Sequence, residues 1–246
     1  MKKWIAAAAG CMLLAAGMLG YLVYNGYILL NGRAAQRYEV RGVDVSAWQG
    51  EINWAELAAQ GIDFAFIKAS EGSSHVDGRF EDNWEGAGKT GIRIGAYHFF
   101  SYDSPGSTQA DNFVSTVPAE DMLPPVVDVE FYGDKEKHPP QAEDVERELR
   151  DMLARLEAHY GMRPILYATE KSYRMFLAGR FEGYDIWIRD VIGSPELSDG
   201  RAWTFWQYTN RARMTGFSGK EKYIDVNVFA GTTEEFAAYG RQGEEK

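Results

Sequence analysis

The stretch Leu123-Pro124-Pro125-Val126-Val127-Asp128-Val129-Glu130-Phe131 places two carboxylates at the end of a short apolar run. Its β-branched residues predict a buried strand. Side chains at positions i and i+2 of a strand share a face, so Asp128 and Glu130 should project together while Val127 and Val129 pack on the other face. Two such carboxyl groups repel when both are ionised, so one should titrate at a raised pH. A protonated carboxyl beside an ionised one can break a glycosidic bond. The same sequence is also compatible with a strand that ends in two solvated acids without a catalytic role.

The composition fits one folded domain and excludes several classes of partner. The chain has 246 residues, of which 45% are hydrophobic and 14% aromatic, and its formal net charge is −10. An acidic domain without a basic patch is a poor candidate for binding nucleic acid. The single cysteine, Cys11, allows no intramolecular disulfide, and the four histidines lack the spacing of metal ligands. The sequence therefore predicts no nucleic-acid partner, no metal and no cofactor.

The first thirty residues differ from the rest of the chain. Lys2 and Lys3 precede the apolar stretch 4–24, which is long enough to span a bilayer. The two lysines favour an N-terminus that stays in the cytoplasm. We therefore expect a signal anchor over residues 1–30 that holds the protein in the cell membrane, a linker over 31–39, and the remainder outside the cytoplasm. A cleaved signal peptide, which would release a secreted protein, is the alternative.

From residue 40 onward, strand-like and helix-like segments alternate. The expected strands cover residues 40–46, 63–69, 92–100, 126–131, 164–168, 185–189, 203–208 and 224–229. The expected helices cover residues 53–60, 79–89, 108–117, 142–160, 172–177 and 233–239. Such alternation implies a parallel sheet, and eight strands in this length predict an α/β fold, an irregular TIM-like β/α barrel over residues 40–240. Few helices separate the last three strands, so the regular pattern should break there before a polar tail at 241–246.

Acidic and aromatic side chains gather at the expected strand ends. In β/α barrels the active site forms at the C-terminal ends of the strands. Acids and aromatics that converge there suit a carbohydrate, because aromatic faces stack on sugar CH surfaces while polar edges bind hydroxyl groups. The candidate residues are Asp44, Lys68, Glu71, Tyr97, His98, Asp128, Glu130, Tyr167, Trp187, Arg189, Trp206, Gln207 and Asp225. Each aromatic residue taken alone is more often part of a core than of a site.

Six motifs in a fixed order carry a family resemblance. They are R-G-V-D-V-S-A-W-Q-G at 41–50, F-A-F-I-K-A-S-E-G at 64–72, I-G-A-Y-H-F at 94–99, P-V-V-D-V-E at 125–130, W-Q-Y at 206–208 and I-D-V-N-V-F at 224–229. Together they closely resemble the glycoside hydrolase family 25 lysozymes. The resemblance implies an irregular β/α barrel that cleaves the β-1,4 bond between N-acetylmuramic acid and N-acetylglucosamine in peptidoglycan. The chain departs from the family at I-W-I-R-D-V, 186–191, where many relatives have an alanine after W-I and a tyrosine further on; this touches the sugar contacts but not the acids.

The resemblance also implies roles for individual residues. Glu130 matches the catalytic acid of the family, and Asp128 matches the neighbour that acts on the 2-acetamido group of the substrate. Asp44 and Asp225 match the acids of the first and last strands, which would hold the network and raise the pKa of Glu130. The expected substrate-binding residues are Lys68, Glu71, Tyr97, His98, Tyr167, Trp187, Trp206 and Gln207. Attack by the acetamido group would retain the anomeric configuration, while direct displacement with inversion stays open.

Three functions remain to be compared. The leading hypothesis is a membrane-tethered muramidase that acts on peptidoglycan strands during remodelling of the cell wall. The second is a chitinase-like hydrolase, because paired acids with acetamido participation also serve that chemistry. The third is a tethered barrel that binds wall glycan without cutting it. A pure binder has no need of a buried acid pair, so the four acids argue against it.

Overall fold

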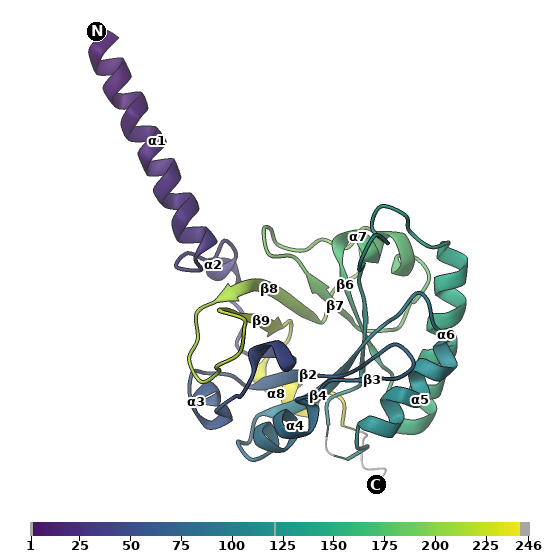
Figure 1. Cartoon of the computed structure of the whole chain (residues 1–246). Coiled ribbons are helices and arrows are strands. Elements are labelled where there is room, and N and C mark those ends of the chain that lie inside the picture. Colours follow the sequence, from purple (N-terminus) through teal and green to yellow (C-terminus); the bar gives the residue numbers. More distant parts are fainter. Residues whose placement is uncertain (1, 121, 242–246) are drawn as a thin grey trace.

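The computed structural model describes residues 2–120 and 122–241, and within them one sheet closes into a barrel (Figure 1). The strands are β1 (Arg41–Val45), β2 (Phe64–Glu71), β3 (His75–Val76), β4 (Arg93–Phe99), β5 (Val126–Val129), β6 (Ile165–Thr169), β7 (Ile186–Arg189), β8 (Phe205–Ala212) and β9 (Ile224–Phe229). Strand β1 pairs with both β2 and β9, which closes a barrel of eight strands, and β3 adds to β2 as a short hairpin. The predicted α/β barrel is confirmed.

The direction of β9 breaks the regular pattern. Neighbouring strands are parallel from β1 through β2 and β4 to β8, whereas β9 runs antiparallel to both β8 and β1. A loop replaces the helix that a parallel crossover would need between β8 and β9. The start of β9 therefore lies at the barrel end where the parallel strands finish. This places Asp225 near the other acids although it begins its strand.

The barrel interior is filled by side chains that alternate along each strand. Phe64 and Phe66 of β2 point inward and pack against Phe205 and Trp187 at ring-centroid distances of 4.7–5.3 Å. Such filling of a small barrel leaves no open pore. Gly95 of β4 makes room for it, because a Cβ there would lie 2.8 Å from the Phe66 ring. The aromatic side chains thus fill the barrel interior below the cavity. Farther along the strands, the inward-facing residues are polar and line that cavity.

Helices cover the outside of the barrel. They are α3 (Trp54–Ala58), α4 (Phe80–Gly88), α5 (Gly106–Thr116), α6 (Ala142–Tyr160), α7 (Glu170–Ser172), which continues as a π-helical turn over Tyr173–Leu177, and α8 (Thr233–Ala238). Helix α6 buries the apolar stripe expected from its sequence and ends at Gly161, whose φ is 65°. It packs beside α5 (Figure 1). Tyr160 Oη donates to the carbonyl of Val117, directly after α5, at 3.0 Å. Val127 and Val129 pack on this outer side, as predicted.

The N-terminal segment is helical and lies outside the barrel (Figure 1). Helix α1 (Lys2–Tyr24) projects away from the barrel, and the short helix α2 (Gly32–Ala35) follows it (Figure 1). In the described part of the chain, the structure contains no helix with both the length and the apolarity needed to cross a membrane, so it does not support the predicted membrane anchor. The predicted linker, residues 31–39, begins with a contact to the barrel, because Asn31 is buried and its Nδ2 donates to the carbonyl of Asp190 at 2.9 Å. Within the predicted tail, 242–246 lie outside the described residues.

Candidate active site

The four predicted acids line one cavity of about 440 Å³ at the polar end of the barrel. Asp44 lies on β1, Asp128 on β5 and Asp225 on β9, while Glu130 directly follows β5. Four of the predicted substrate-binding residues line the same cavity, namely Lys68, Tyr97, Tyr167 and Gln207. The alternation of side chains along separate strands thus brings together carboxylates that lie up to 181 positions apart in the sequence.

Asp44 and Asp225 form a pair across β1 and β9, where they are direct register partners. Gln207 Nε2 donates to Asp44 Oδ2 at 2.9 Å and to Asp225 Oδ2 at 3.1 Å, and Asn227 Nδ2 donates to Asp44 Oδ2 at 2.8 Å. Burial raises the pKa of Asp44 even though these amide donors oppose the shift. Burial, and then the charge of Asp44, raise the pKa of Asp225 well above its usual value. One proton shared by the pair relieves the repulsion between two adjacent buried carboxylates.

Two buried aromatic residues fix the orientation of the amide groups that hold this pair. Tyr167 Oη donates to Gln207 Oε1 at 2.9 Å, and Trp187 Nε1 donates to Asn227 Oδ1 at 2.8 Å. Each amide oxygen therefore accepts on one side, so each amide nitrogen must point toward the acids. Burial raises the pKa of Tyr167 well above its usual value, which keeps its hydroxyl a donor.

Asp128 is almost completely enclosed, with 6% of its surface exposed. Within the described part of the chain, its Oδ1 is buried and has no hydrogen-bond partner. Burial, and then the charge of Glu130, raise the pKa of Asp128 well above its usual value. A buried carboxylate oxygen without a donor is costly to maintain, so this atom is well placed to accept a hydrogen bond from a ligand.

Glu130 lies half-buried at the mouth of the same cavity. Burial raises its pKa, the charges of Arg189 and Lys68 oppose that shift, and the charge of Asp44 adds to it. The direction is the one expected from the sequence, but burial rather than the neighbouring Asp128 is the main cause. A carboxyl group with a raised pKa that reaches the cavity can hold a proton where a substrate would sit.

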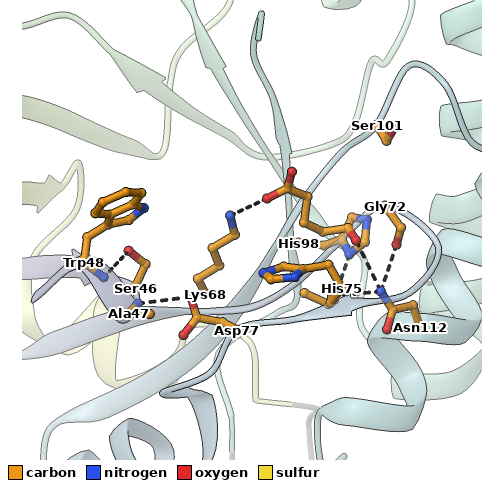
Figure 2. A network of polar contacts seen from close by, with 12 residues as sticks. Ser46, Ala47, Trp48, Lys68, Gly72, His75, Asp77, His98, Ser101 and Asn112 are labelled. Carbon is orange, nitrogen blue, oxygen red and sulfur yellow. Dashed lines mark hydrogen bonds and ion pairs between the residues drawn. The ribbon is translucent and has the colours of Figure 1, made fainter. Parts of the chain in front are cut away.

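Lys68 is held in the cavity by a neighbour on its own strand. Its Nζ pairs with Glu71 Oε2 at 2.7 Å and lies 5.0 Å from the centre of the Phe99 ring. Asn112 of α5 supports the turn that carries Glu71, because its Nδ2 donates to the carbonyls of Gly72 at 2.9 Å and His75 at 3.1 Å (Figure 2). Glu71, predicted as a substrate-binding residue, does not line the cavity and instead positions Lys68.

The rim of the cavity carries an exposed aromatic ring. Trp48 lies in the short 3₁₀ turn Ala47–Gln49 and is 58% exposed. Ser46 Oγ accepts from the backbone N–H of Trp48 at 3.3 Å, and Asp77 Oδ2 accepts from that of Ala47 at 3.0 Å (Figure 2). From the other side, the N–H of Gly219 donates to the carbonyl of Gln49 at 2.7 Å. The turn is thus fixed from both sides and presents the indole to the cavity mouth.

His98 is a correction to the predicted substrate-binding set. It is fully buried on the outer side of β4, where its ring lies 6.2 Å from that of Phe113, and it does not line the cavity. Gln109 Nε2 donates to the carbonyl of Ser101, so Gln109 Oε1 must be the atom that accepts from His98 Nε2 at 3.1 Å. His98 Nδ1 then accepts from Ser70 Oγ at 2.8 Å. Burial lowers the pKa of His98 to about 4, so it is a neutral structural residue.

The two predicted tryptophan contacts also lie outside the cavity. Trp206 points to the outer side of β8, where its Nε1 donates to the carbonyl of Asp190 at 2.8 Å. Trp187 points inward but lies below the cavity, with 2% of its surface exposed and its ring 4.7 Å from that of Phe66. Both serve packing. Trp206 faces outward because it is adjacent to the inward-facing Gln207, whereas Trp187 shares the inward face with Arg189 but lies one inward position deeper, below the cavity.

Several residues of the cavity were not in the predicted set. They are Val45, Ser46, Trp48, Gln49, Phe99, Asn210, Glu221 and Tyr223. Arg189, a strand-end candidate that the sequence did not assign to substrate binding, also lines the cavity, two positions after the inward-facing Trp187. The others include Asn210 near the end of β8 and Glu221 and Tyr223 in the loop before β9. Nothing in the sequence of this loop predicts that it reaches the rim of the cavity. Asn227 was also missed, although I-D-V-N alternates it with Asp225 on one face.

We expect Asp225→Asn to stabilise the protein at neutral pH. Because the pKa of Asp225 is raised in the folded state, its contribution to stability is full below the ordinary carboxyl pKa and is lost as the pH rises. The asparagine keeps an acceptor for Gln207 and removes this loss. Each pKa unit corresponds to about 1.4 kcal/mol, and each kcal/mol to about 2–4 °C in Tm for a chain of this size.

Thermal unfolding followed by circular dichroism at several pH values measures this effect. The variant should melt above the wild type at pH 7, and the difference should vanish near pH 4. A variant that melts below the wild type at pH 7 would contradict the raised pKa of Asp225. Asp63→Asn is the matched control. Asp63 directly precedes β2, does not line the cavity, and accepts from the backbone N–H of Arg41 at 2.9 Å, an acceptor that the asparagine keeps, so this variant should show no such gain.

Comparison with known proteins agrees with this geometry. The family model described as glycosyl hydrolases family 25 matches residues 43–217. A family 25 glycosyl hydrolase of Bacillus anthracis has a similar structure, with a TM-score of 0.80 and 55% identity over 83% of this chain and 95% of that one. The Escherichia coli K12 protein YegX is 36% identical over 89% of this chain and 81% of its own length. Lysozyme M1 of Streptomyces globisporus is 34% identical over 78% of this chain and 68% of its own length. The chain therefore belongs to family 25 of the glycosyl hydrolases and is a glycoside hydrolase.

Proposed function

We propose that this enzyme is a muramidase that hydrolyses the β-1,4 bond between N-acetylmuramic acid and N-acetylglucosamine in peptidoglycan. The observation that carries the proposal is the pair of carboxyl groups of Asp128 and Glu130, which face one cavity and both have a raised pKa. The relative from Streptomyces globisporus is named a lysozyme, and that name supports the choice of substrate.

Glu130 serves as the general acid and then as the general base. Its half-buried carboxyl holds a proton that it donates to the leaving oxygen of the glycosidic bond. After the first step the resulting carboxylate removes a proton from the attacking water. The nearby charges of Arg189 and Lys68 moderate the rise of its pKa, so the group can work in both directions.

Asp128 positions the 2-acetamido group of the substrate. The unpartnered Oδ1 of Asp128 accepts the N–H of that group, which turns the acetamido oxygen toward the anomeric carbon. The substrate then supplies its own nucleophile, and water opens the cyclic intermediate to give net retention of configuration. Proton NMR of the first-formed anomer checks this step, and an inverted product would eliminate acetamido participation.

Asp44 and Asp225 complete the negative environment of the acid pair. Asp44 raises the pKa of both Asp128 and Glu130, and the amides of Gln207 and Asn227 fix its carboxylate in place. Negative charge close to the anomeric centre stabilises the positive charge that develops there in the transition state. The pair therefore acts on the reaction through electrostatics rather than by transferring a proton to the sugar.

Incubation of the purified protein with peptidoglycan and, in parallel, with chitin oligomers tests the proposal. We expect soluble fragments from peptidoglycan and none from chitin oligomers. Cleavage of chitin oligomers alone would identify a chitinase-like enzyme instead. Binding to peptidoglycan without release of fragments, by a protein whose fold is verified by circular dichroism, would identify a glycan binder.

We also propose that the barrel acts outside the cytoplasm, because peptidoglycan lies beyond the cytoplasmic membrane. Cell fractionation with an antibody against the barrel tests the location. Full-length protein in the membrane fraction would favour retention of the N-terminal segment as an anchor, and a shortened soluble form would favour its cleavage. Protein recovered only from the cytoplasm would contradict the proposed location.

A further inference from the structure

Arg189 lies at the junction of two cavities. It ends β7 and lines both the active-site cavity of about 440 Å³ and a second cavity of about 420 Å³. The two cavities share only Glu130 and Arg189 among their lining residues. A substrate cut at Glu130 can therefore extend past Arg189 into the second cavity, whose walls include Phe131, Val191 and Ile192.

Among the described residues, Arg189 is the cation of this region that forms no direct hydrogen bond or ion pair. Within residues 2–120 and 122–241, Lys68 pairs with Glu71 at 2.7 Å and Lys171 pairs with Glu136 at 3.1 Å, whereas the guanidinium of Arg189 forms neither an ion pair nor a hydrogen bond. A guanidinium group offers five N–H donors in a planar fork that fits a carboxylate. Its donors remain available to a ligand.

Apart from Glu130, the acids of the second cavity are turned to other partners. Asp190 Oδ1 accepts from the backbone N–H groups of Ile192 at 3.0 Å and Gly193 at 2.8 Å, so the carboxylate next in sequence to Arg189 closes its own loop. Glu170 pairs with Arg174 on the adjoining helix. This arrangement leaves the fork of Arg189 open at the edge of the catalytic cavity.

We propose that Arg189 determines specificity by binding a carboxylate on the substituent of the muramic acid residue. The inference rests on the proposed muramidase function. Muramic acid differs from glucosamine by a lactyl ether, whose carboxyl group is either free or linked to a short peptide that carries carboxylates of its own. Both forms present a carboxylate beside the sugar, and the second cavity provides the volume for the substituent. Binding by a planar fork would select muramyl substrates over neutral glycans.

A simpler role for Arg189 is to balance the charge of the catalytic acids. Its positive charge opposes the raised pKa of Asp44, Asp128, Glu130 and Asp225. Loss of that charge would alter turnover of every substrate by the same factor. Recognition of a carboxylate would instead alter the ratio between substrates that differ only in that carboxylate, and this ratio separates the two roles.

The test measures kcat/KM of the full-length protein on four preparations of glycan strands. Two retain their peptides, and two have been stripped by an amidase, which leaves the lactyl carboxylate free; one member of each pair has its carboxylates converted to neutral methylamides. The variants are Arg189→Gln, Arg189→Lys and, as the matched control, Arg147→Gln on the exposed face of α6. Release of reducing ends is followed at a fixed pH and ionic strength.

We expect amidation to lower kcat/KM of the wild type and of Arg147→Gln by about tenfold to a hundredfold, the size of a charge-assisted hydrogen bond. The affected pair identifies whether the carboxylate belongs to the peptide or to the lactyl group. Arg189→Gln should abolish the discrimination, and Arg189→Lys should restore only part of it because the ammonium lacks the fork.

Two results would overturn the inference while leaving the muramidase function intact. One is a wild type that does not distinguish charged from amidated strands. The other is an Arg189→Gln variant that loses the same factor on all four substrates, which would assign Arg189 to charge balance alone. A folded wild type that cleaves none of the four preparations would refute the muramidase function itself, and the inference with it.

Discussion

Replacing Glu130 with glutamine should lower the turnover of peptidoglycan by roughly 10²–10⁴-fold, the usual contribution of a positioned general acid. Glutamine has nearly the same shape but cannot donate a proton with comparable ease. Glu130 lies at the cavity mouth, so its replacement leaves the core and the amide network of Asp44 untouched. The expected loss is therefore in kcat. The initial rate of release of reducing ends measures it, and circular dichroism verifies the fold.

Glu221→Gln is the matched control for this variant. Glu221 is an exposed acid that lines the same cavity from the loop before β9. Its replacement removes the same charge and should change the rate by less than about threefold. Wild-type activity in Glu130→Gln would refute the assignment of the acid. Equal losses in the two variants would indicate that the cavity needs negative charge rather than a proton donor.

Replacing Asp128 with asparagine should lower kcat by roughly 10²–10³-fold, as expected for a group that stabilises the transition state. The asparagine keeps only one acceptor oxygen for the acetamido N–H, and it places an uncharged group where positive charge develops. Because the residue acts chiefly in the transition state, we expect a small change in KM. Steady-state kinetics on a soluble peptidoglycan fragment measures both parameters.

The double variant tests whether the two carboxyl groups act as one unit. If Asp128 positions a nucleophile for a step that Glu130 assists, the losses cannot be additive. Asp128→Asn combined with Glu130→Gln should then be only slightly slower than Glu130→Gln alone. Losses that multiply would contradict a shared step and assign the two residues independent functions.

The sequence predicts much of the barrel because alternation along strands is a local property. The β-branched run before Asp128 and the aromatic residues of β2 specify which segments become strands, and the apolar spacing of residues 142–160 specifies α6. The inward-facing acids then lie close together because the C-terminal ends of the parallel strands lie at the same end of the barrel. The direction of β9 was harder to predict. The alternation of inward and outward residues is the same for a parallel and an antiparallel strand, and only the length of the connection between β8 and β9 distinguishes the two.

The errors within the site have a common cause. In Tyr97-His98 and Trp206-Gln207, both residues of the pair could bind a sugar. Only one of each pair can face the barrel interior, and the sequence of the strand alone does not say which one does. Packing decides which residue faces inward. Gly95 accommodates the Phe66 ring inside the barrel, so Tyr97, two positions later, also faces inward and His98 faces outward. A contact between β2 and β4 thus decides which residue reaches the cavity, and no single segment contains that information.

The contacts of the N-terminal segment are distant in sequence, so the sequence did not predict them. Arg213 Nη1 donates to the carbonyl of Asn25 at 3.2 Å, and Asn31 Nδ2 donates to the carbonyl of Tyr208 at 3.3 Å. Tyr208 of β8 and Arg213, just after this strand, thus contact both the predicted anchor segment and the predicted linker. Hydrogen bonds across such separations have no signature in either segment taken alone.

Mass spectrometry of borohydride-reduced digestion products tests the central claim most directly. Purified peptidoglycan would be digested by the wild type and by Glu130→Gln in parallel, so that each new reducing end is converted to a sugar alcohol. A muramidase predicts reduced muramic acid ends from the wild type and none from the variant. Reduced glucosamine ends from the wild type would show that the other glycosidic bond is cut, and would contradict the function proposed for this enzyme.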